Sequence, residues 1–161
     1  MPDMLVKLYG LPDSASAVTN LRDQGVTCRR PESYERSAVL EFVQRAFPHW
    51  IDEVLAGFSS VLPTVYVAAE AGAVLGFACY NVTRPNYFGP TGVDEAQRGR
   101  GIGKVLLLQA LEALRAEGYA YAIIGGVGPA AFYEKAVGAT IIPGSEAGIY
   151  AGMLRTRGDT R

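Results

Sequence analysis

The stretch Gln97–Lys104, QRGRGIGK, places three glycines among three basic side chains. An apolar run typical of a strand, residues 87–93, precedes it, and an amphipathic segment typical of a helix follows from Ile102. Glycines at such a junction leave backbone N–H groups accessible and let a bulky anion approach closely. The dipole of the following helix adds partial positive charge at the same point. The junction therefore predicts a site for a ligand that carries a diphosphate.

The spacing of the glycines narrows the kind of ligand. Gly99, Gly101 and Gly103 do not fit the dinucleotide fingerprint G-x-G-x-x-G, and neither Ser nor Thr follows Lys104, as the Walker A pattern requires. A P-loop-like nucleotide site is therefore disfavoured. The run instead fits R-x-x-G-x-G, which starts at Arg98. Because a pattern this short also occurs in solvated basic turns, its context has to decide.

Length and composition limit the classes of protein to consider. A chain of 161 residues has room for one domain, or for one domain with a short appendage. With 49% hydrophobic and 19% charged residues, it is expected to form a packed core and not a disordered chain. The net charge of -1 offers no basic field for nucleic acid or an anionic membrane. The cationic cluster is thus local and suits a small anionic ligand.

The cysteines and the histidine indicate neither a disulfide framework nor a metal site. Cys28 and Cys79 are far apart in strand-like settings, and His49 is the only histidine. No His, Cys and Asp cluster has metal-ligand spacing, so we expect no metal. Because no apolar run reaches membrane-spanning length and the start of the chain lacks the pattern of a signal peptide, we expect a cytoplasmic protein with reduced thiols.

Periodicity and turn residues predict alternating strands and helices. After residue 25 the order is one strand, two helices, three strands, a helix, a strand, a helix and two strands, which indicates an α+β fold with one mixed sheet covered by helices. The strands are expected at 5–9, 26–30, 64–69, 73–83, 87–93, 119–127, 140–142 and 149–154, and the helices at 12–23, 33–47, 50–58, 102–117 and 129–137.

This order and the motif of Arg98, Gly101 and Gly103 resemble the GNAT acyltransferase superfamily over residues 25–154. The resemblance implies a mostly antiparallel sheet of six to seven strands flanked by helices, and acetyl-CoA as co-substrate. Residues 1–24 are expected to form an N-terminal strand-helix appendage, residues 25–155 the GNAT domain and residues 156–161 a frayed tail. The motif implies cofactor contacts from Arg98, Gly99, Arg100, Gly101, Ile102, Gly103 and Lys104.

A second match lies in GPAAFYEKAVGA, on the last predicted helix. In the family, a tyrosine on this helix protonates the departing thiolate of coenzyme A, and the match implies that role for Tyr133, next to Phe132 as a cofactor contact. A phenol suits the role because it stays protonated at neutral pH. Alone, the same tyrosine would be read as a packing residue.

A third match is the strand that contains Thr91, Gly92 and Val93. In the family, this strand parts from the next one, hydrogen-bonds the pantetheine arm, and polarises the thioester carbonyl through a backbone N–H. Pro90 cannot donate to a strand ladder, so a bulge or a parting of strands is expected here. Gly92 is expected to leave the strand open to close approach.

Together these elements imply direct transfer of the acetyl group to an amine in a ternary complex. No histidine pairs with Cys28 or Cys79 in the sequence, which disfavours a covalent acyl-enzyme. The alternative is a non-catalytic module that binds acyl-CoA for regulation or sensing. The presence of Tyr133 favours the enzyme.

Two positions depart from the family pattern. Gly126 stands where many relatives have an asparagine that meets the cofactor, and residues 87–93 lack the carboxylate that several relatives use as general base. The remaining candidates for the base are His49, Asp52 and Glu53, or water relayed by Tyr80 or Tyr87.

The acceptor pocket is expected between residues 47–62 and the strands around residue 80. Candidate contacts are His49, Glu53, Tyr80, Asn81 and Tyr87. Their aromatic character suits a small-molecule amine, such as an amino sugar, better than a basic protein tail. The predicted hairpin at residues 140–154 offers an edge for a homodimer, which the sequence does not require.

Overall fold

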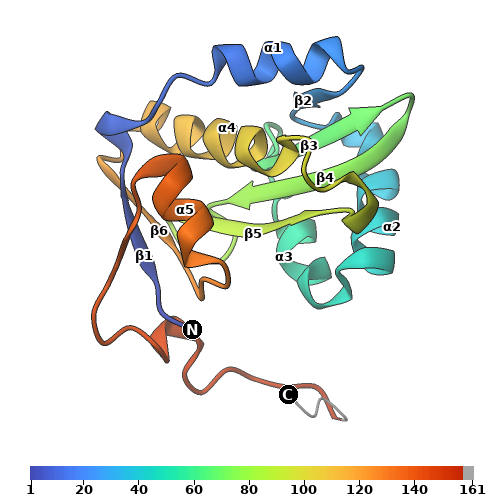
Figure 1. Ribbon diagram of the computed structural model, residues 1–161. Helices are drawn as coiled ribbons and strands as arrows, with labels where there is room; N and C mark the ends of the chain where they lie inside the picture. Colours follow the sequence, from blue (N-terminus) through green and yellow to red (C-terminus); the bar gives the residue numbers. More distant parts are fainter. Residues whose placement is uncertain (158–161) are drawn as a thin grey trace.

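The computed structural model describes residues 1–157. Its seven strands form one sheet in the order β2-β3-β4-β5-β6-β1-β7, with helices on both faces (Figure 1). The strands are β1 (Met4–Lys7), β2 (Thr27–Arg29), β3 (Val65–Glu70), β4 (Ala73–Tyr80), β5 (Tyr87–Val93), β6 (Tyr121–Ile124) and β7 (Thr140–Ile141). The α-helices are α1 (Ala15–Asp23), α2 (Arg36–Ala46), α3 (Ile51–Ala56), α4 (Ile102–Ala116) and α5 (Ala130–Val137), and short 3₁₀ turns include η3 (Pro48–Trp50), η4 (Glu95–Gln97) and η5 (Gly148–Tyr150).

The sheet is mixed, as the sequence predicts. Only β5 and β6 run parallel, and every other neighbouring pair is antiparallel. Each face of the sheet has its own core. In β4, Ala78 and Tyr80 belong to the cluster that packs on α4, whereas Phe77 and Cys79 belong to the cluster under α2 and α3. Successive side chains of a strand point to opposite faces, so one strand serves both cores.

Helix α4 anchors the larger core. Nine of its fifteen residues are buried, at the spacing of one broad apolar face. Helix α1 lies over α4, where Ser14 Oγ donates a 2.8 Å hydrogen bond to Glu112 and Leu21 enters the core. The N-terminal end of α4 lies against β5, where a Cβ on Gly103 would stand 3.7 Å from the Val93 side chain, and this places the glycine-rich junction at the end of that strand.

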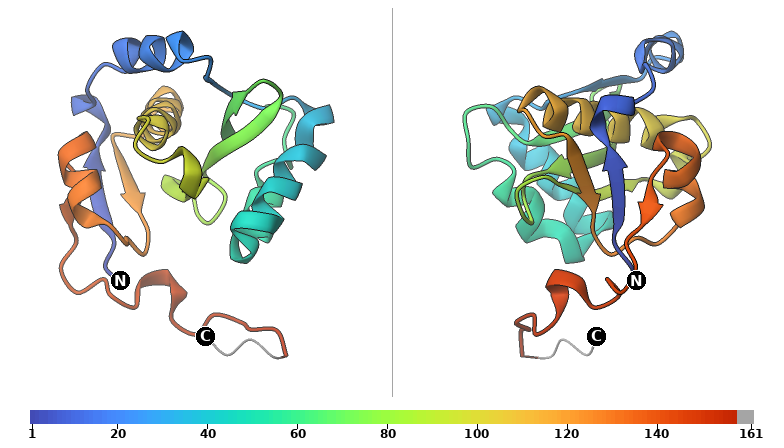
Figure 2. Two further views of the ribbon diagram at one scale, coloured as in Figure 1. Left: turned by 45° about the vertical axis from the view of Figure 1, so that its right-hand side comes forward. Right: turned by 90° about the vertical axis from the view of Figure 1, so that its left-hand side faces the viewer.

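The N-terminal strand is not an appendage to the sheet. β1 lies inside it, paired antiparallel with β6 on one side and β7 on the other (Figure 2). Met4 and Val6 are fully buried in the core. A strand of four residues carries too little periodicity to reveal its partners, and pairing across more than a hundred residues is a tertiary choice that local pattern does not encode.

The expected hairpin at residues 140–154 does not form. β7 has two residues, pairs with β1, and is followed by an irregular segment with η5. Gly148 and Gly152 adopt positive φ, and Leu154 is 94% exposed, so this stretch has neither extended backbone nor a buried face. Residues 158–161, most of the predicted frayed tail, lie outside the described residues.

Candidate active site

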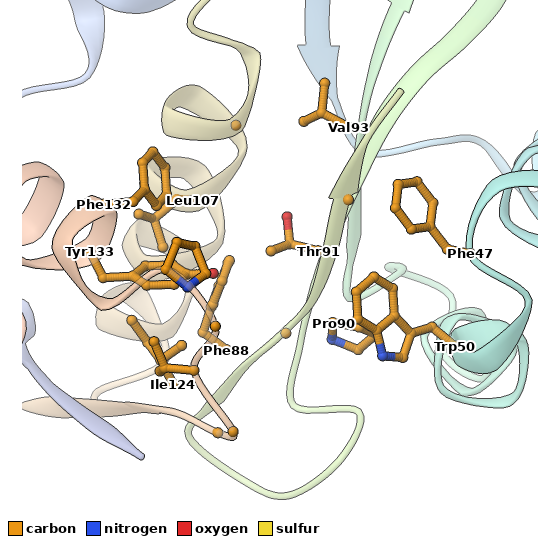
Figure 3. Close-up of a pocket in the computed structure, with 18 of the residues that line it drawn as sticks. Phe47, Trp50, Phe88, Pro90, Thr91, Val93, Leu107, Ile124, Phe132 and Tyr133 are labelled. Carbon is orange, nitrogen blue, oxygen red and sulfur yellow. The ribbon is translucent and has the colours of Figure 1, made fainter. Parts of the chain in front are cut away.

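Strands β5 and β6 pair over two residues and then separate. The parallel register joins Tyr87 to Ile123 and Phe88 to Ile124, whereas β5 stays paired with β4 as far as Val93. The edge of β5 beyond Phe88 therefore has no strand beside it, as Figure 3 shows. The parting of strands predicted here is confirmed.

A cavity of about 1130 Å³ occupies this gap. Its walls come from α4 and α5 on one face of the sheet and from residues 47–53 on the other, so a single cavity joins the two faces. We name its two ends by the nearest helix. The α4 end is lined by residues of the glycine-rich junction, and the α3 end by His49, Trp50, Glu53, Thr83 and Tyr150.

The glycine-rich junction has the open backbone that its sequence predicts. Gly99 and Gly101 adopt φ of +82° and +87°, and no atom lies within 4 Å of where a Cβ would stand on either. Gly101 is also the N-cap of α4, and no side chain caps the helix there. The first N–H groups of α4 therefore lack a side-chain partner and can meet an anion.

Of the three basic residues in this junction, two line the cavity. Arg98 and Lys104 do so, and Arg100 does not. The Arg100 guanidinium instead donates to Glu70 at 3.0 Å and to Gln97, itself a lining residue, at 2.6 Å. The expectation that Arg100 contacts the cofactor is thus not supported by its placement, because its charge is already paired with Glu70.

Tyr133 lies in α5, at the centre of the cavity wall. It is 7% exposed, with the rings of Phe88 and Phe132 packed edge-on against it. Figure 3 shows its hydroxyl pointing into the gap, toward Thr91. Burial raises the pKa of the Tyr133 hydroxyl above its ordinary value, so the phenol remains a proton donor at neutral pH.

Thr91, Gly92 and Val93 line the cavity, although Gly92 serves a purpose other than the one expected. A Cβ on Gly92 would stand 2.6 Å from Phe47 Cζ. The glycine therefore admits the Phe47 ring against β5 and does not leave this face of the strand open. Thr91 Oγ1 donates to the Phe77 carbonyl at 2.9 Å, which holds β5 on β4.

At the α3 end, the structure brings two predicted acceptor contacts together. His49 and Glu53 both line the cavity. Thr83 Oγ1 donates a 2.6 Å hydrogen bond to Glu53 Oε1, which fixes the carboxylate at the rim. Asp52, a predicted candidate for the general base, is exposed and does not line the cavity.

Three other predicted acceptor contacts lie elsewhere. Tyr80 is 1% exposed in the core, on the α4 face of the sheet. Asn81 stabilises the turn after β4, where its side chain donates to Glu117 and accepts from the Asn86 N–H. Tyr87 lies behind the cavity wall, 3.2 Å from where a Cβ on Gly125 would stand. Each side chain of a strand points to one face of the sheet only, and the sequence does not predict which side chains face the cavity.

Sequence reasoning missed the contribution of the segment after β7. Tyr150 and Met153 line the cavity, on an irregular stretch without periodicity. The Gly125-Gly126 pair was a usable signal, because adjacent glycines after a strand indicate a close approach of other atoms. The N–H of Gly126 donates to Asp3 Oδ1 at 2.8 Å. This N–H is thus engaged within the protein.

The comparison with family models decides the class of this domain. Residues 27–139 match the model of the Acetyltransferase (GNAT) family, which is more than half of the chain. The chain belongs to the GNAT acetyltransferase family. The family match confirms the resemblance drawn from Arg98, Gly101 and Gly103, and with it the expected acyltransferase class. A comparison with curated proteins found no match.

Solved structures of GNAT domains share the fold. The GCN5-related glucosamine N-acetyltransferase region of a fungal multi-domain GH3 β-N-acetylglucosaminidase superposes with a TM-score of 0.71 at 20% identity, covering 88% of this chain and 19% of that one. A GCN5-related N-acetyltransferase from Sphaerobacter thermophilus gives 0.66 at 20% identity, covering 88% and 48%. The chain thus spans about a fifth and about half of these two proteins. At this identity the likeness shows the fold alone.

Residues 1–157 contain neither a metal-binding cluster nor a membrane-spanning helix. No group of three or more His, Cys, Asp or Glu side chains is placed to hold a metal ion. No helix in this part of the chain has the length and apolar character to cross a membrane.

Proposed function

We propose that this chain is an N-acetyltransferase that moves the acetyl group of acetyl-CoA directly to a primary amine of a small molecule, such as an amino sugar, in a ternary complex. One observation carries the proposal: a single cavity is lined by cationic Arg98 and Lys104 at the glycine-rich junction, by anionic Glu53 of α3, and by the buried phenol of Tyr133. This distribution suits a phosphorylated donor and a cationic acceptor that enter from opposite faces.

The residues at the α4 end fit coenzyme A. Gly101 and the uncapped N-terminus of α4 would receive the pyrophosphate, with Arg98 and Lys104 as counter-charges. The unpaired edge of β5 supplies backbone groups for the amides of the pantetheine arm, and Ile102 and Phe132 border its path. Acetyl-CoA supplies an acyl group already activated as a thioester.

The chemistry requires proton transfers that Tyr133 can assist. As the carbon–nitrogen bond forms, the carbon–sulfur bond breaks, and the leaving thiolate takes a proton from the Tyr133 hydroxyl. The acceptor ammonium loses two protons in all, one before attack and one as the amide forms. One of these replaces the proton that Tyr133 gave up, and the other is released. Glu53 and His49 remain the candidates for the general base that receives the proton lost by the ammonium before attack.

The placement of the cysteines supports transfer without an acyl-enzyme. Neither Cys28 nor Cys79 lines the cavity. Burial raises the pKa of the Cys28 thiol to about 11 and raises the pKa of Cys79 as well, so both remain poor nucleophiles.

The alternative is an acyl-CoA-binding module without catalysis, which the cavity would also serve. The two proposals separate in a calorimetric titration with acetyl-CoA followed by a thiol-release assay over a panel of amines. Binding of acetyl-CoA with thiol release supports the enzyme, and binding without release on any amine supports the module. Titration with ATP and magnesium is the control. If acetyl-CoA does not bind, both the enzyme proposal and the binding-module proposal are wrong. A cytoplasmic location and a homodimer remain predictions.

A further inference from the structure

The Glu53 carboxylate is held at the α3 end of the cavity by a hydrogen bond from a side chain. Thr83 Oγ1 donates to Oε1 at 2.6 Å, and the ion pairs Arg29–Glu35, Arg45–Asp94 and Arg100–Glu70 do not include Glu53. A partly buried carboxylate gains most from a cationic partner. This end of the cavity is thus prepared for a ligand with a positive charge.

Aromatic and apolar side chains border this carboxylate. Trp50 ends η3, is the N-cap residue of α3, and lines the cavity together with Glu53. Its ring stacks on Phe47 with centroids 5.5 Å apart and planes 18° apart, which holds it in place. Figure 3 shows the indole beside Pro90 on the α3 side of β5. A flat apolar group next to a positive charge would meet both a ring and a carboxylate here.

Tyr150 closes the same end from the opposite direction. Its hydroxyl lies 2.9 Å from where a Cβ on Gly125 would stand, and its ring 3.5 Å from the corresponding point on Gly126, so it packs directly on the glycine pair. Burial raises the pKa of the Tyr150 hydroxyl, and the negative charges of Glu53 and Asp3 raise it further. Tyr150 and Glu53 are therefore within electrostatic range of each other.

The segment that carries Tyr150 is tied to β1. The Asp3 N–H donates to Ser145 Oγ at 2.8 Å, and the Ile142 N–H donates to the Asp3 carbonyl at 2.9 Å. Both β1 and this segment lie outside residues 27–139, which carry the family pattern. Tyr150 thus lies outside the residues that the family model matches.

We propose, on the basis of the function proposed above, that the acceptor is a primary amine with an aromatic or alkyl body. Its ammonium binds at Glu53, and its body lies between Trp50 and Tyr150, which makes Tyr150 a specificity-determining residue. A polyhydroxylated acceptor would need polar partners around its ring. Apart from His49, Glu53 and Thr83, the walls at this end present mainly apolar surface, from Phe47, Trp50, Pro90, Tyr150 and Met153.

Trp50 provides a direct test of binding, because it is the only tryptophan in the chain. The protein saturated with coenzyme A is titrated with 2-phenylethylamine, with uncharged 2-phenylethanol and with glucosamine, while tryptophan fluorescence is followed. We expect 2-phenylethylamine to bind at least about tenfold more tightly than either of the others, the value of one charge-assisted hydrogen bond. Equal binding of the amine and the alcohol, tighter binding of glucosamine, or no binding of the amine would overturn the proposal.

Matched variants measure the contributions of Glu53 and Tyr150 to amine binding separately. Glu53→Gln should weaken binding of 2-phenylethylamine about tenfold, whereas Asp52→Asn, one residue away on the exposed side of α3, should not. Tyr150→Ala should weaken it to a similar degree, and Tyr150→Phe, which keeps the ring, should bind close to wild type. If Glu53→Gln or Tyr150→Ala binds the amine as wild type does, that residue does not recognise the acceptor.

A parallel thiol-release assay distinguishes this proposal from the general one. Thiol release with glucosamine but not with 2-phenylethylamine would support the proposed acetyltransferase function and contradict the proposal of an apolar acceptor. Binding of 2-phenylethylamine that depends on Glu53, without thiol release on any amine, would support the acceptor site and reject catalysis.

Discussion

The Asp3 carboxylate accepts a 2.8 Å hydrogen bond from the backbone N–H of Gly126, 123 residues away in the sequence. Asp3 is 6% exposed, and a Cβ on Gly148 would stand 3.2 Å from its second oxygen. One side chain thus connects β1, the loop that forms the cavity wall after β6, and the segment that carries Tyr150. The wall depends on both ends of the described chain.

Asp3→Ala should lower the free energy of unfolding by about 1–3 kcal/mol, because it leaves the Gly126 N–H without its partner in a partly buried position. Urea denaturation would measure this loss. Asp23→Ala, at an exposed position at the end of α1, is the control and should stay within about 0.5 kcal/mol of wild type. Equal stability of Asp3→Ala and Asp23→Ala would show that the hydrogen bond contributes nothing.

Gly101→Val should abolish acetyl-CoA binding, because a side chain there would fill the space above the N-terminus of α4 and strain a residue with φ of +87°. Gly118→Val is a matched control: it has φ of +100°, equally open surroundings, and a place after the opposite end of α4. Both variants should lose about 1–3 kcal/mol of stability to backbone strain. Only Gly101→Val should lose binding in a calorimetric titration, and loss in both would mean that strain alone is responsible.

Arg98→Ala and Arg100→Ala should differ in their effect on acetyl-CoA affinity, although the sequence motif implies a cofactor contact for both residues. Arg98→Ala should weaken acetyl-CoA binding, with the largest effect at low salt, because screening diminishes the contribution of an exposed charge. Arg100→Ala should leave affinity unchanged and change stability little, because solvent screens an ion pair such as Arg100–Glu70. Titrations at two ionic strengths would test both, and reduced affinity in Arg100→Ala would place its charge at the ligand.

Tyr133→Phe should lower kcat by roughly 10- to 100-fold as a modest loss of general-acid catalysis, with little change in acetyl-CoA affinity. Because burial raises the Tyr133 pKa above its ordinary value of 10.0, the wild-type donor should be present across neutral and mildly alkaline pH and be lost only as pH rises through that elevated pKa. The rate of thiol release should therefore not fall between pH 7 and 9 through deprotonation of Tyr133. Full activity in Tyr133→Phe would exclude the hydroxyl as general acid.

Gly92→Ala should destabilise the fold by about 1–3 kcal/mol, because its methyl group would meet the Phe47 ring. In the Phe47→Ala background the same substitution should cost much less, and a double-mutant cycle measured by urea denaturation gives the difference. Gly10→Ala, where a Cβ meets nothing within 4 Å, is the control. Additive effects of Gly92→Ala and Phe47→Ala would show that the two residues do not interact.

The parts of the site that sequence reasoning identified share a local origin. The junction around Gly101, the start of α4 and the parting of strands near Pro90 each follow from residues adjacent in the chain, through backbone freedom, the helix dipole and a missing N–H donor. The assignments that did not hold concern the direction of side chains. Arg100 turns to Glu70, and Tyr80 faces the core, because packing from elsewhere selects the face.

The sequence by itself determined the class of the domain: the order of strands and helices as far as β7, the glycine-rich junction, and Tyr133 on the last helix. Their signals are short-range, so they survive without knowledge of the fold. Only the tertiary structure decided that β1 enters the sheet beside β6 and that Asp3 and Tyr150 help to build the far wall of the cavity. Such contacts join residues more than a hundred positions apart, and their energy comes from burial and hydrogen bonds that exist only once the whole sheet has assembled.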